Sequence, residues 1–308
     1  MKMKVLGIGE VVLDKSNIIK HYPKDGEKTQ ASQTSYSVGG PVPAALILLA
    51  RLGVQCTLIC SLGNDDTAKV IKKKLKKENI KLIINQQAKT KTNTVLVNRK
   101  TGSRTIIKDR IKHRPTKNLS SSLIRTIDLI IIDRHEPIAF QEILKKKKIT
   151  TPIVIDPSTE ISSKTLSMLQ KAEHPIIPIE SLKKYNNKLS QLDNLKQLQQ
   201  IAQKTIIVTA GGLGSLSYNG KKTNFYPAYQ VDVVDTLGAG DVFRGAYGFG
   251  VLNKWNEEKI INFANLVAAM QCRKTGNGTA IPYKKEIYQF MKKACTKKIN
   301  LKDLNLKN

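Results

Sequence analysis

Short apolar runs alternate with longer segments of helical period along most of the chain. The apolar runs, rich in β-branched residues, are 4–9, 55–60, 81–84, 128–133, 152–156, 175–179 and 205–210. Runs of this kind are typical of strands buried on both faces of a parallel sheet. Helical patterns occupy 43–53, which Gly53 closes, and 65–79. The alternation predicts an α/β fold: one domain over 1–308 with a doubly wound, mostly parallel sheet flanked by helices.

Two early segments break this rhythm. Residues 28–38 and 92–110 alternate polar and apolar positions at period two, and the second segment contains a turn at Lys100-Thr101-Gly102. We therefore expect a small β-lid formed by about 15–38 and 92–112. A further antiparallel hairpin is predicted over 214–227, turning at Asn219-Gly220. The end of the chain, 296–308, is predicted to be a frayed basic tail.

The chain is strongly basic, which raises the question of nucleic-acid binding. Its 308 residues contain 52 Lys and Arg against 24 Asp and Glu, a formal net charge of +28. The lysines gather in 71–79 and 144–149, where solvated helix faces are expected, and aromatic residues make up only 5%. Single-strand binding platforms interleave aromatic with basic residues. We therefore expect no nucleic-acid partner, although a positive field could concentrate an anionic substrate.

Cysteine usage and hydropathy indicate a cytoplasmic protein. Four cysteines in a chain of this length, without a CxxC pair, predict neither a disulfide framework nor a zinc site. Glu10 and Asp14 interrupt the apolar start, so no signal peptide is expected. The longest apolar stretch, 41–50, contains two prolines and is too short to span a membrane.

The stretch "DTLGAGDVFRGAYGFG" (235–250) carries the clearest chemistry. Gly238, Ala239 and Gly240 precede Asp241 and a predicted helix over 241–252. Small residues allow backbone N–H groups to approach a ligand, and a helix N-terminus favours anions. An ionised Asp241 beside such an anion hole could accept a proton from an attacking hydroxyl. On these residues alone, a simple capping role for Asp241 is equally good.

Two other glycine patterns fail as nucleotide motifs. "GIGEVV" (7–12) begins like a dinucleotide fingerprint, but Val12 stands where the third glycine belongs. "GSLSYNGKK" (214–222) has five residues between its glycines where a P-loop has four. His135, in "DRHEP" (133–137), follows a predicted strand at the edge where α/β proteins bind ligands. It could contact substrate, or be a loop histidine without a ligand.

Several segments together resemble the ribokinase-like (PfkB) family of carbohydrate kinases. The resemblance rests on 235–250, 208–216, 263–282, 7–14, 38–53 and 101–106, and covers roughly residues 4 to 283. It implies transfer of the γ-phosphoryl group of ATP, carried with Mg²⁺, to a hydroxyl of a sugar or sugar-like substrate. It also implies that a homodimer could form through the lid.

The resemblance assigns roles to particular residues of this chain. It makes Asp241 the catalytic base and Gly238, Ala239 and Gly240 the anion hole. It places the substrate against Asp14, Gly39, Gly40 and Arg104. It places the nucleotide against Thr209, Gly211, Gly214, Asn265 and Gly276.

The chain also departs from the family pattern. Ala44 stands where an Asn usually hydrogen-bonds the sugar, so that donor and acceptor are lost. Ile179 and Leu182 occupy the places of an Asn-x-x-Glu motif linked to magnesium and phosphate, and the metal ligands stay unassigned. Some relatives hold a monovalent cation such as K⁺ at the places of Asp235 and Thr236, so this chain could bind one there. A relative that only binds nucleotide or sugar, as a regulator, is the alternative function.

Overall fold

The structure is a computed structural model, and it describes residues 2–299 except Gly102, Ile149, Thr159 and Asn277, and also Leu304. The strands are β1 (Lys4–Ile8), β2 (Val12–Ile19), β3 (Ala31–Gly39), β4 (Gln55–Leu62), β5 (Lys81–Gln86), β6 (Thr92–Asn98), β7 (Arg104–Ile107), β8 (Leu129–Asp133), β9 (Ile153–Asp156), β10 (His174–Pro178), β11 (Ile206–Thr209), β12 (Gly214–Tyr218) and β13 (Thr223–Pro227). The α-helices are α1 (Pro41–Arg51), α2 (Asp66–Lys77), α3 (Ser121–Arg125), α4 (Pro137–Lys146), α5 (Ser163–Lys171), α6 (Ile179–Tyr185), α7 (Gln191–Ala202), α8 (Ala239–Leu252), α9 (Glu257–Gln271) and α10 (Lys284–Met291), and a 3-10 turn, η1, spans Gly211–Leu213.

The predicted parallel sheet is confirmed. Nine strands lie in the order β13-β12-β11-β10-β9-β8-β1-β4-β5. From β11 to β5 every neighbouring pair runs parallel. The predicted hairpin over 214–227 is also confirmed, because β12 and β13 are antiparallel and extend this edge of the sheet. The carboxyl ends of the parallel strands therefore share one edge, where doubly wound folds bind ligands.

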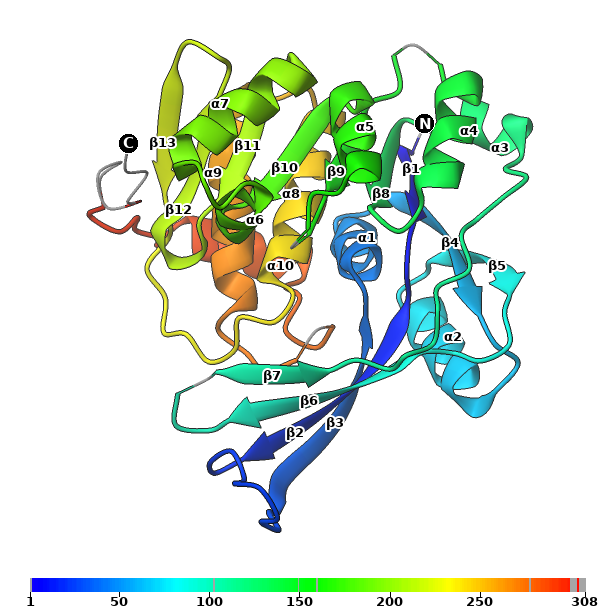
Figure 1. Cartoon of the computed structure of the whole chain (residues 1–308), viewed down its shortest axis with the longest axis vertical. Helices are drawn as coiled ribbons and strands as arrows, with labels where there is room; N and C mark the ends of the chain where they lie inside the picture. The colour runs from blue at the N-terminus through cyan, green and yellow to red at the C-terminus, as the bar shows by residue number, and fades with distance from the viewer. Residues whose placement is uncertain are drawn as a thin grey trace.

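Helices cover both faces of this sheet, as Figure 1 shows. Alternate strand residues point to opposite faces, so Val5 packs in one core and Leu6 in the other. Helices α1, α2, α8, α9 and α10 contribute to the first core, and α3 to α7 contribute to the second. Within the described residues, no helix has both the length and the hydropathy needed to cross a membrane.

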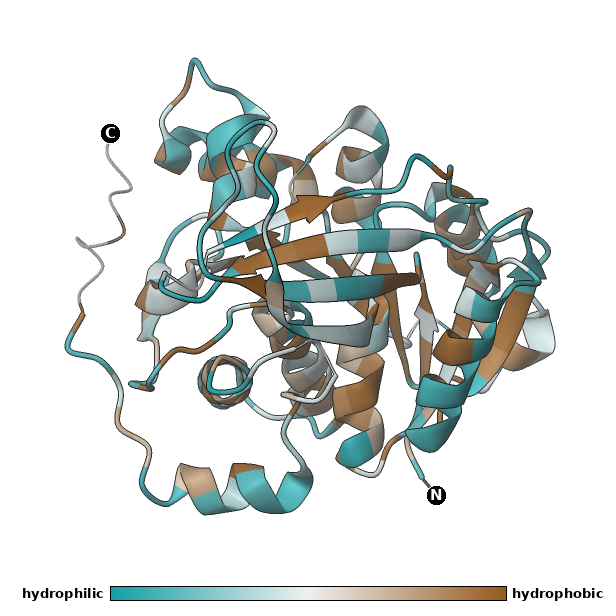
Figure 2. Cartoon of the chain, turned by 90° about the horizontal axis from the view of Figure 1, so that it is seen from below, coloured by the Kyte–Doolittle hydropathy of each residue, from teal (hydrophilic) through white to brown (hydrophobic). Residues whose placement is uncertain are grey.

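A second, four-stranded sheet in the order β3-β2-β6-β7, called here the small sheet, lies below this body in Figure 1. Strands β3, β6 and β7 come from the two segments with period-two patterns, and β2 precedes both segments in the chain. Figure 2 views the small sheet from below and shows hydrophilic and hydrophobic residues mixed along its strands. Strands β6 and β7 form the predicted hairpin. Its turn residue Gly102 is outside the described residues.

Two predicted boundaries need correction. Helix α8 begins at Ala239, two residues before the predicted start, because Gly238 adopts a left-handed conformation (φ 75°) and caps it. The predicted tail begins with two residues that pair with the body. Thr296 bridges to Tyr229, and the Lys297 N–H donates to the Ala228 carbonyl at 2.8 Å, so backbone pairing holds this part in place. Of the remaining tail, 300–303 and 305–308 are outside the described residues.

Candidate active site

The turn before α8 has the geometry of an anion site. Gly238 is the N-cap, and its carbonyl accepts from the Val242 N–H at 2.9 Å. Ala239, Gly240 and Asp241 form the first helical turn, whose N–H groups have no partner within the helix. A Cβ placed on Gly240 would meet no atom within 4 Å, so the space above this turn is open. The turn can accept an anionic group such as a phosphoryl group.

Asp241 lies at the edge of this open space, with its side chain 20% exposed. Burial raises the pKa of Asp241 to about 8, Arg104 opposes the shift, and Asp14 and Asp133 add to it. A carboxyl group with a pKa near neutrality is well suited to proton transfer at physiological pH. The contributions of Arg104 and Asp14 also show that residues of the small sheet lie within electrostatic range of α8.

Arg244 contacts the Asp241 carboxylate directly and was missed in the sequence analysis. Its guanidinium donates to Asp241 Oδ1 and also pairs with Asp156, the last residue of β9. Burial lowers the pKa of Arg244 to about 9, and Asp133 opposes the shift. The sequence did contain a signal, because residues three apart on a helix are neighbours.

The two glycines assigned to substrate lie where no side chain fits. Gly39 ends β3 and Gly40 caps α1 with φ 107°. A Cβ on Gly39 would overlap the Asp14 carboxylate, and a Cβ on Gly40 would overlap the Glu10 carbonyl. The missing side chains therefore let the β3–α1 turn lie directly against β2 and the β1–β2 junction.

Asp14 and Arg104 share one face of the small sheet. Asp14 pairs with Asn93 on β6, and Val97, four residues further along that strand, pairs with Arg104 on β7. Asn93 Nδ2 donates to Asp14 Oδ1 at 2.9 Å. Burial raises the pKa of Asp14 to about 6, with Asn93 and Arg104 opposing the shift and Glu10 adding to it. Sequence reasoning missed Asn93 because strand pairing, not local sequence, brings it to Asp14.

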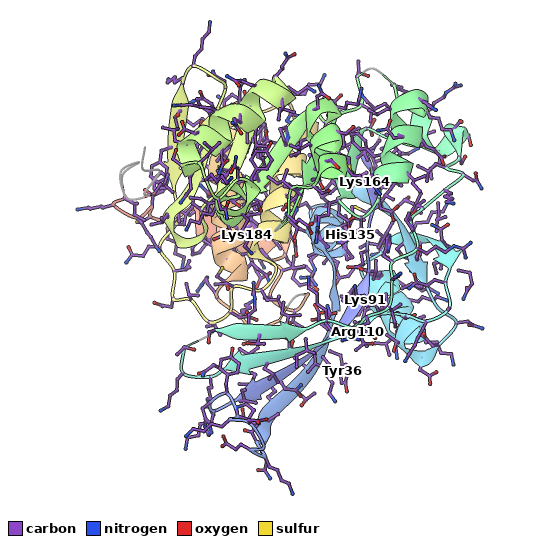
Figure 3. The ribbon with its side chains drawn as sticks, in the orientation of Figure 1. Tyr36, Lys91, Arg110, His135, Lys164 and Lys184 are labelled. Carbon is purple, nitrogen blue, oxygen red and sulfur yellow. The ribbon has the colours of Figure 1, made fainter. Side chains whose placement is uncertain are left out.

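A polar network surrounds the ends of β1 and β8. The Asp133 carboxylate, at the end of β8, accepts from the N–H groups of Glu10 and His135, each at 2.8 Å. Burial raises the pKa of Asp133 to about 7. Glu10 accepts from Lys91 at 2.9 Å and lies 4.0 Å from His135, and His113 binds Glu136 at 2.8 Å. Figure 3 shows Lys91 beside the small sheet and His135 on the body above it. His135 thus has a protein partner at the predicted edge.

Asp235 ties three segments together. Its Oδ1 accepts from the Leu237 N–H and its Oδ2 from the Gly276 N–H, each at 2.9 Å. Arg104 lies 3.8 Å from Asp235 Oδ1. The Asp235 side chain therefore holds the loop of Gly276 against the turn before α8, while the Thr236 carbonyl accepts from the Ala239 N–H at 3.3 Å. Among the described residues, no group of three His, Cys, Asp or Glu side chains is suited to a metal ion.

The residues assigned to phosphate contact follow β11. Thr209 ends this strand, Gly211 (φ 54°) begins the 3-10 turn η1, and Gly214 (φ 117°) follows that turn. Both glycines have backbone conformations that L side chains rarely adopt. A Cβ on Gly214 would also overlap the Tyr226 carbonyl. This turn follows the carboxyl end of β11. Asp133 and Asp156 stand at the carboxyl ends of β8 and β9, so all three lie at the same edge of the sheet.

Asn265 is buried in α9 and both of its polar groups bind protein. Its Oδ1 accepts from the Ser215 hydroxyl at 3.0 Å, and its Nδ2 donates to the Tyr226 carbonyl at 3.0 Å. The side chain thus holds the β12–β13 hairpin against α9. The contact between Asn265 and the nucleotide stays a prediction. The observed contacts of Asn265 fix how the hairpin packs on α9.

The residues that depart from the family pattern lie in the core. Ala44 is fully buried in α1, and Ile179 and Leu182 are buried in α6. Glu180 is exposed in the first turn of α6. Apolar side chains at these places offer no ligand to a metal or a hydroxyl, so any such contacts must come from other residues.

Comparison with known proteins supports the family resemblance. The family model described as pfkB family carbohydrate kinase matches residues 4–284. A ribokinase of Staphylococcus aureus (strain COL) is 27% identical over 307 residues, covering 94% of this chain and 100% of the relative.

Solved structures show the same fold. The crystal structure of ribokinase from Thermotoga maritima has a TM-score of 0.79 at 22% identity, covering 94% of this chain and 99% of that one. The structure of Arabidopsis thaliana ribokinase complexed with ribose and ATP has a TM-score of 0.79 at 19% identity, covering 95% and 99%. With the family model matching nearly the whole chain, the protein belongs to the pfkB family of carbohydrate kinases.

Proposed function

We propose that the protein is an ATP-dependent sugar kinase in which Asp241 is the catalytic base. The observation that carries this proposal is the placement of Asp241 in the first turn of α8, within electrostatic range of Asp14 and Arg104 on one face of the small sheet. Asp14 and Arg104 come from that face, and Asp241 comes from the body. A substrate held between them would have one hydroxyl at a base and beside an anion site.

In the proposed reaction the substrate hydroxyl gives its proton to Asp241 as its oxygen attacks the γ-phosphorus of ATP. The bond from that phosphorus to the bridging oxygen breaks, and ADP leaves. In the turn of Gly238, Ala239 and Gly240, backbone N–H groups stabilise the negative charge on the phosphoryl group in transfer, and the Ala239 N–H would share its weak bond to the Thr236 carbonyl with that group. Most of the acceleration comes from positioning and electrostatics, as in other phosphoryl transfers.

ATP would lie along the loops that follow β11 and β13. Thr209, Gly211 and Gly214 offer backbone close to the phosphates, and Gly276 lies in the loop that Asp235 holds. ATP brings Mg²⁺, which its phosphates bind with few protein ligands. We further propose that the small sheet acts as a lid over the sugar and excludes water during transfer.

A sugar is proposed as the substrate because of the relatives: the Staphylococcus protein is a ribokinase, and the Arabidopsis structure contains ribose and ATP. The burial of Ala44 favours a substrate other than ribose or weaker binding, since α1 supplies no amide there. The same observation supports the alternative of a member that only binds nucleotide or sugar.

The test is ADP release from MgATP with a panel of pentoses, ketohexoses, sugar phosphates, sugar acids and nucleosides. Asp241→Asn should lower kcat by about two to four orders of magnitude while ATP binding is kept. Turnover that survives unchanged in this variant would refute the role of Asp241. ATP binding without turnover on any compound would favour the binding-only alternative.

A further inference from the structure

Arg244 has an unusual position for an arginine, because it is almost fully buried beside the proposed base. It is 5% exposed and lies one helical turn after Asp241 on α8. Its guanidinium contacts the carboxylates of Asp241 and Asp156. The buried Asp156 carboxylate and the partly exposed Asp241 carboxylate thus share one buried cation.

This arrangement is costly for folding alone. Burying a charged group costs several kcal/mol before its partners compensate, and a hydrophobic replacement is often as stable. The residues next to Arg244 on α8, Phe243 and Gly245, are buried in the core, and the chain could pack an apolar side chain there. A role in the chemistry would explain a charge at this place.

The contact geometry indicates what that role is. The Arg244 donor binds Asp241 Oδ1, which leaves Oδ2 to accept a proton from substrate. Asp156 in turn is held at the end of β9, where its Oδ1 accepts from the Ser158 N–H. The sheet therefore fixes Asp156, Asp156 fixes Arg244, and Arg244 fixes the orientation of the Asp241 carboxylate.

The positive charge of Arg244 also supports a role of Asp241 as proton acceptor. The charged groups around Asp241 are Asp14 on β2, Arg104 on β7, Asp133 on β8, Asp156 on β9 and Arg244 on α8 itself. Three acids and burial disfavour its ionised form, and the two arginines favour it. Arg104 belongs to the small sheet, whereas Arg244 belongs to the body and lies on the same helix as Asp241.

We propose that Arg244 is a positioning residue that orients Asp241 through Oδ1 and stabilises the ionised form of that carboxylate for proton acceptance. This inference rests on the proposed kinase function, and its test includes a measurement that needs no turnover.

The first measurement is steady-state kinetics of Arg244→Gln on the panel sugar with the highest wild-type turnover. We expect kcat to fall about 10- to 100-fold, because the base loses its alignment, while the KM for ATP changes less than about twofold. Arg244→Lys retains the positive charge and should recover part of the loss. The matched control is Lys147→Gln. Lys147 is also nearly buried, with its side chain 10% exposed, and binds Glu173 and the Thr151 carbonyl at the opposite, amino end of the strands.

The single variant leaves Asp156 without its cation and could unfold. The double variant Asp156→Asn/Arg244→Gln removes both charges and keeps amide groups that can bond each other. It should fold and still have the low kcat. A double variant with wild-type kcat would overturn the proposal, as would a variant that raises KM at unchanged kcat, since Arg244 would then bind substrate.

The second measurement is the titration of Asp241 by ¹³C NMR with carboxyl-labelled aspartate, its signal being identified by its loss in Asp241→Asn. We expect a higher pKa in Arg244→Gln than in the wild type. An unchanged pKa would overturn the electrostatic part of the proposal. If no sugar is turned over, the proposed function fails, but this titration still decides whether Arg244 acts on Asp241.

Discussion

At the scale of single residues, the site is an accumulation of carboxyl groups with few cations. Asp14, Asp133 and Asp241 each have a pKa raised by burial, and each faces at least one other acid. Such crowding costs stability and is typical of functional sites. The folded protein therefore holds protons that the unfolded chain releases, and its stability must depend on pH.

Asp241→Asn should become progressively more stable than the wild type as pH rises from about 4 to about 8. The pKa of Asp241 is about 8 in the folded protein against 3.8 for an unperturbed Asp. Between these values the folded wild type binds a proton that the unfolded chain does not, so its stability falls with rising pH, and the variant lacks this loss. The free energy of unfolding, measured with urea across this range, checks the prediction.

Asp14→Asn provides an internal comparison. The pKa of Asp14 is raised only to about 6, so its gain over the wild type should level off near that pH. If both variants gained stability over the wild type by an amount independent of pH, the raised pKa values of Asp14 and Asp241 would be contradicted.

At the scale of elements, the site is assembled from segments that side chains tie together. Asp235 joins the turn before α8 to the loop of Gly276, and Asn265 joins α9 to the β12–β13 hairpin. These ties use buried polar groups, which are costly when left without partners. The shape of the proposed nucleotide site should therefore depend on residues that need not touch ATP.

Asn265→Ala should lower the free energy of unfolding by about 1–3 kcal/mol and raise the KM for ATP several-fold, because the hairpin loses its anchor on α9. The matched control is Asn194→Ala. Asn194 is a fully buried asparagine of α7 that donates to the carbonyls of Leu182 and Asn186, at 2.8 and 2.9 Å. It should lose similar stability without a change in the KM for ATP. Equal KM changes in both variants would show a general loss of structure.

At the scale of the whole molecule, the positive charge and the two sheets matter most. A net charge of +28 creates a field that attracts anions and is screened by salt. The small sheet contributes Asp14 and Arg104, and the large sheet contributes Asp133 and Asp156 at its carboxyl edge. Substrate would lie where the two meet.

The KM for ATP should rise at least about threefold between 0.05 and 0.5 M ionic strength, because the field that concentrates the nucleotide is screened. The KM for a neutral sugar, measured in the same series, should change less than about twofold. Tetramethylammonium chloride should set the ionic strength, with K⁺ and Mg²⁺ held constant. If both KM values rose equally, salt would be acting on the protein structure and not on the attraction of ATP.

Much of the fold could be predicted from local patterns. Runs such as 128–133 and 152–156 are β-branched and continuous, and buried parallel strands require this composition. The prediction that Gly53 closes the helix at 43–53 is confirmed, because Gly53 lies just after α1 in a left-handed conformation (φ 94°). The start of α8 was misplaced because a left-handed Gly238 caps the helix, so Ala239 and Gly240, which were predicted to precede the helix, already belong to its first turn.

The amino-acid sequence by itself determined the α/β class, the two sheets and the turn at 238–241. Hydrophobic periodicity and clusters of small residues are local properties that can be read without the fold. Only the tertiary structure decided which groups surround Asp241. Asp156 and Arg244 are 88 positions apart in the sequence but form an ion pair because β9 ends where α8 begins. Asn93 meets Asp14 through strand pairing, and Lys91 meets Glu10 across the base of the small sheet. Distances between remote residues depend on packing, and no local pattern encodes them.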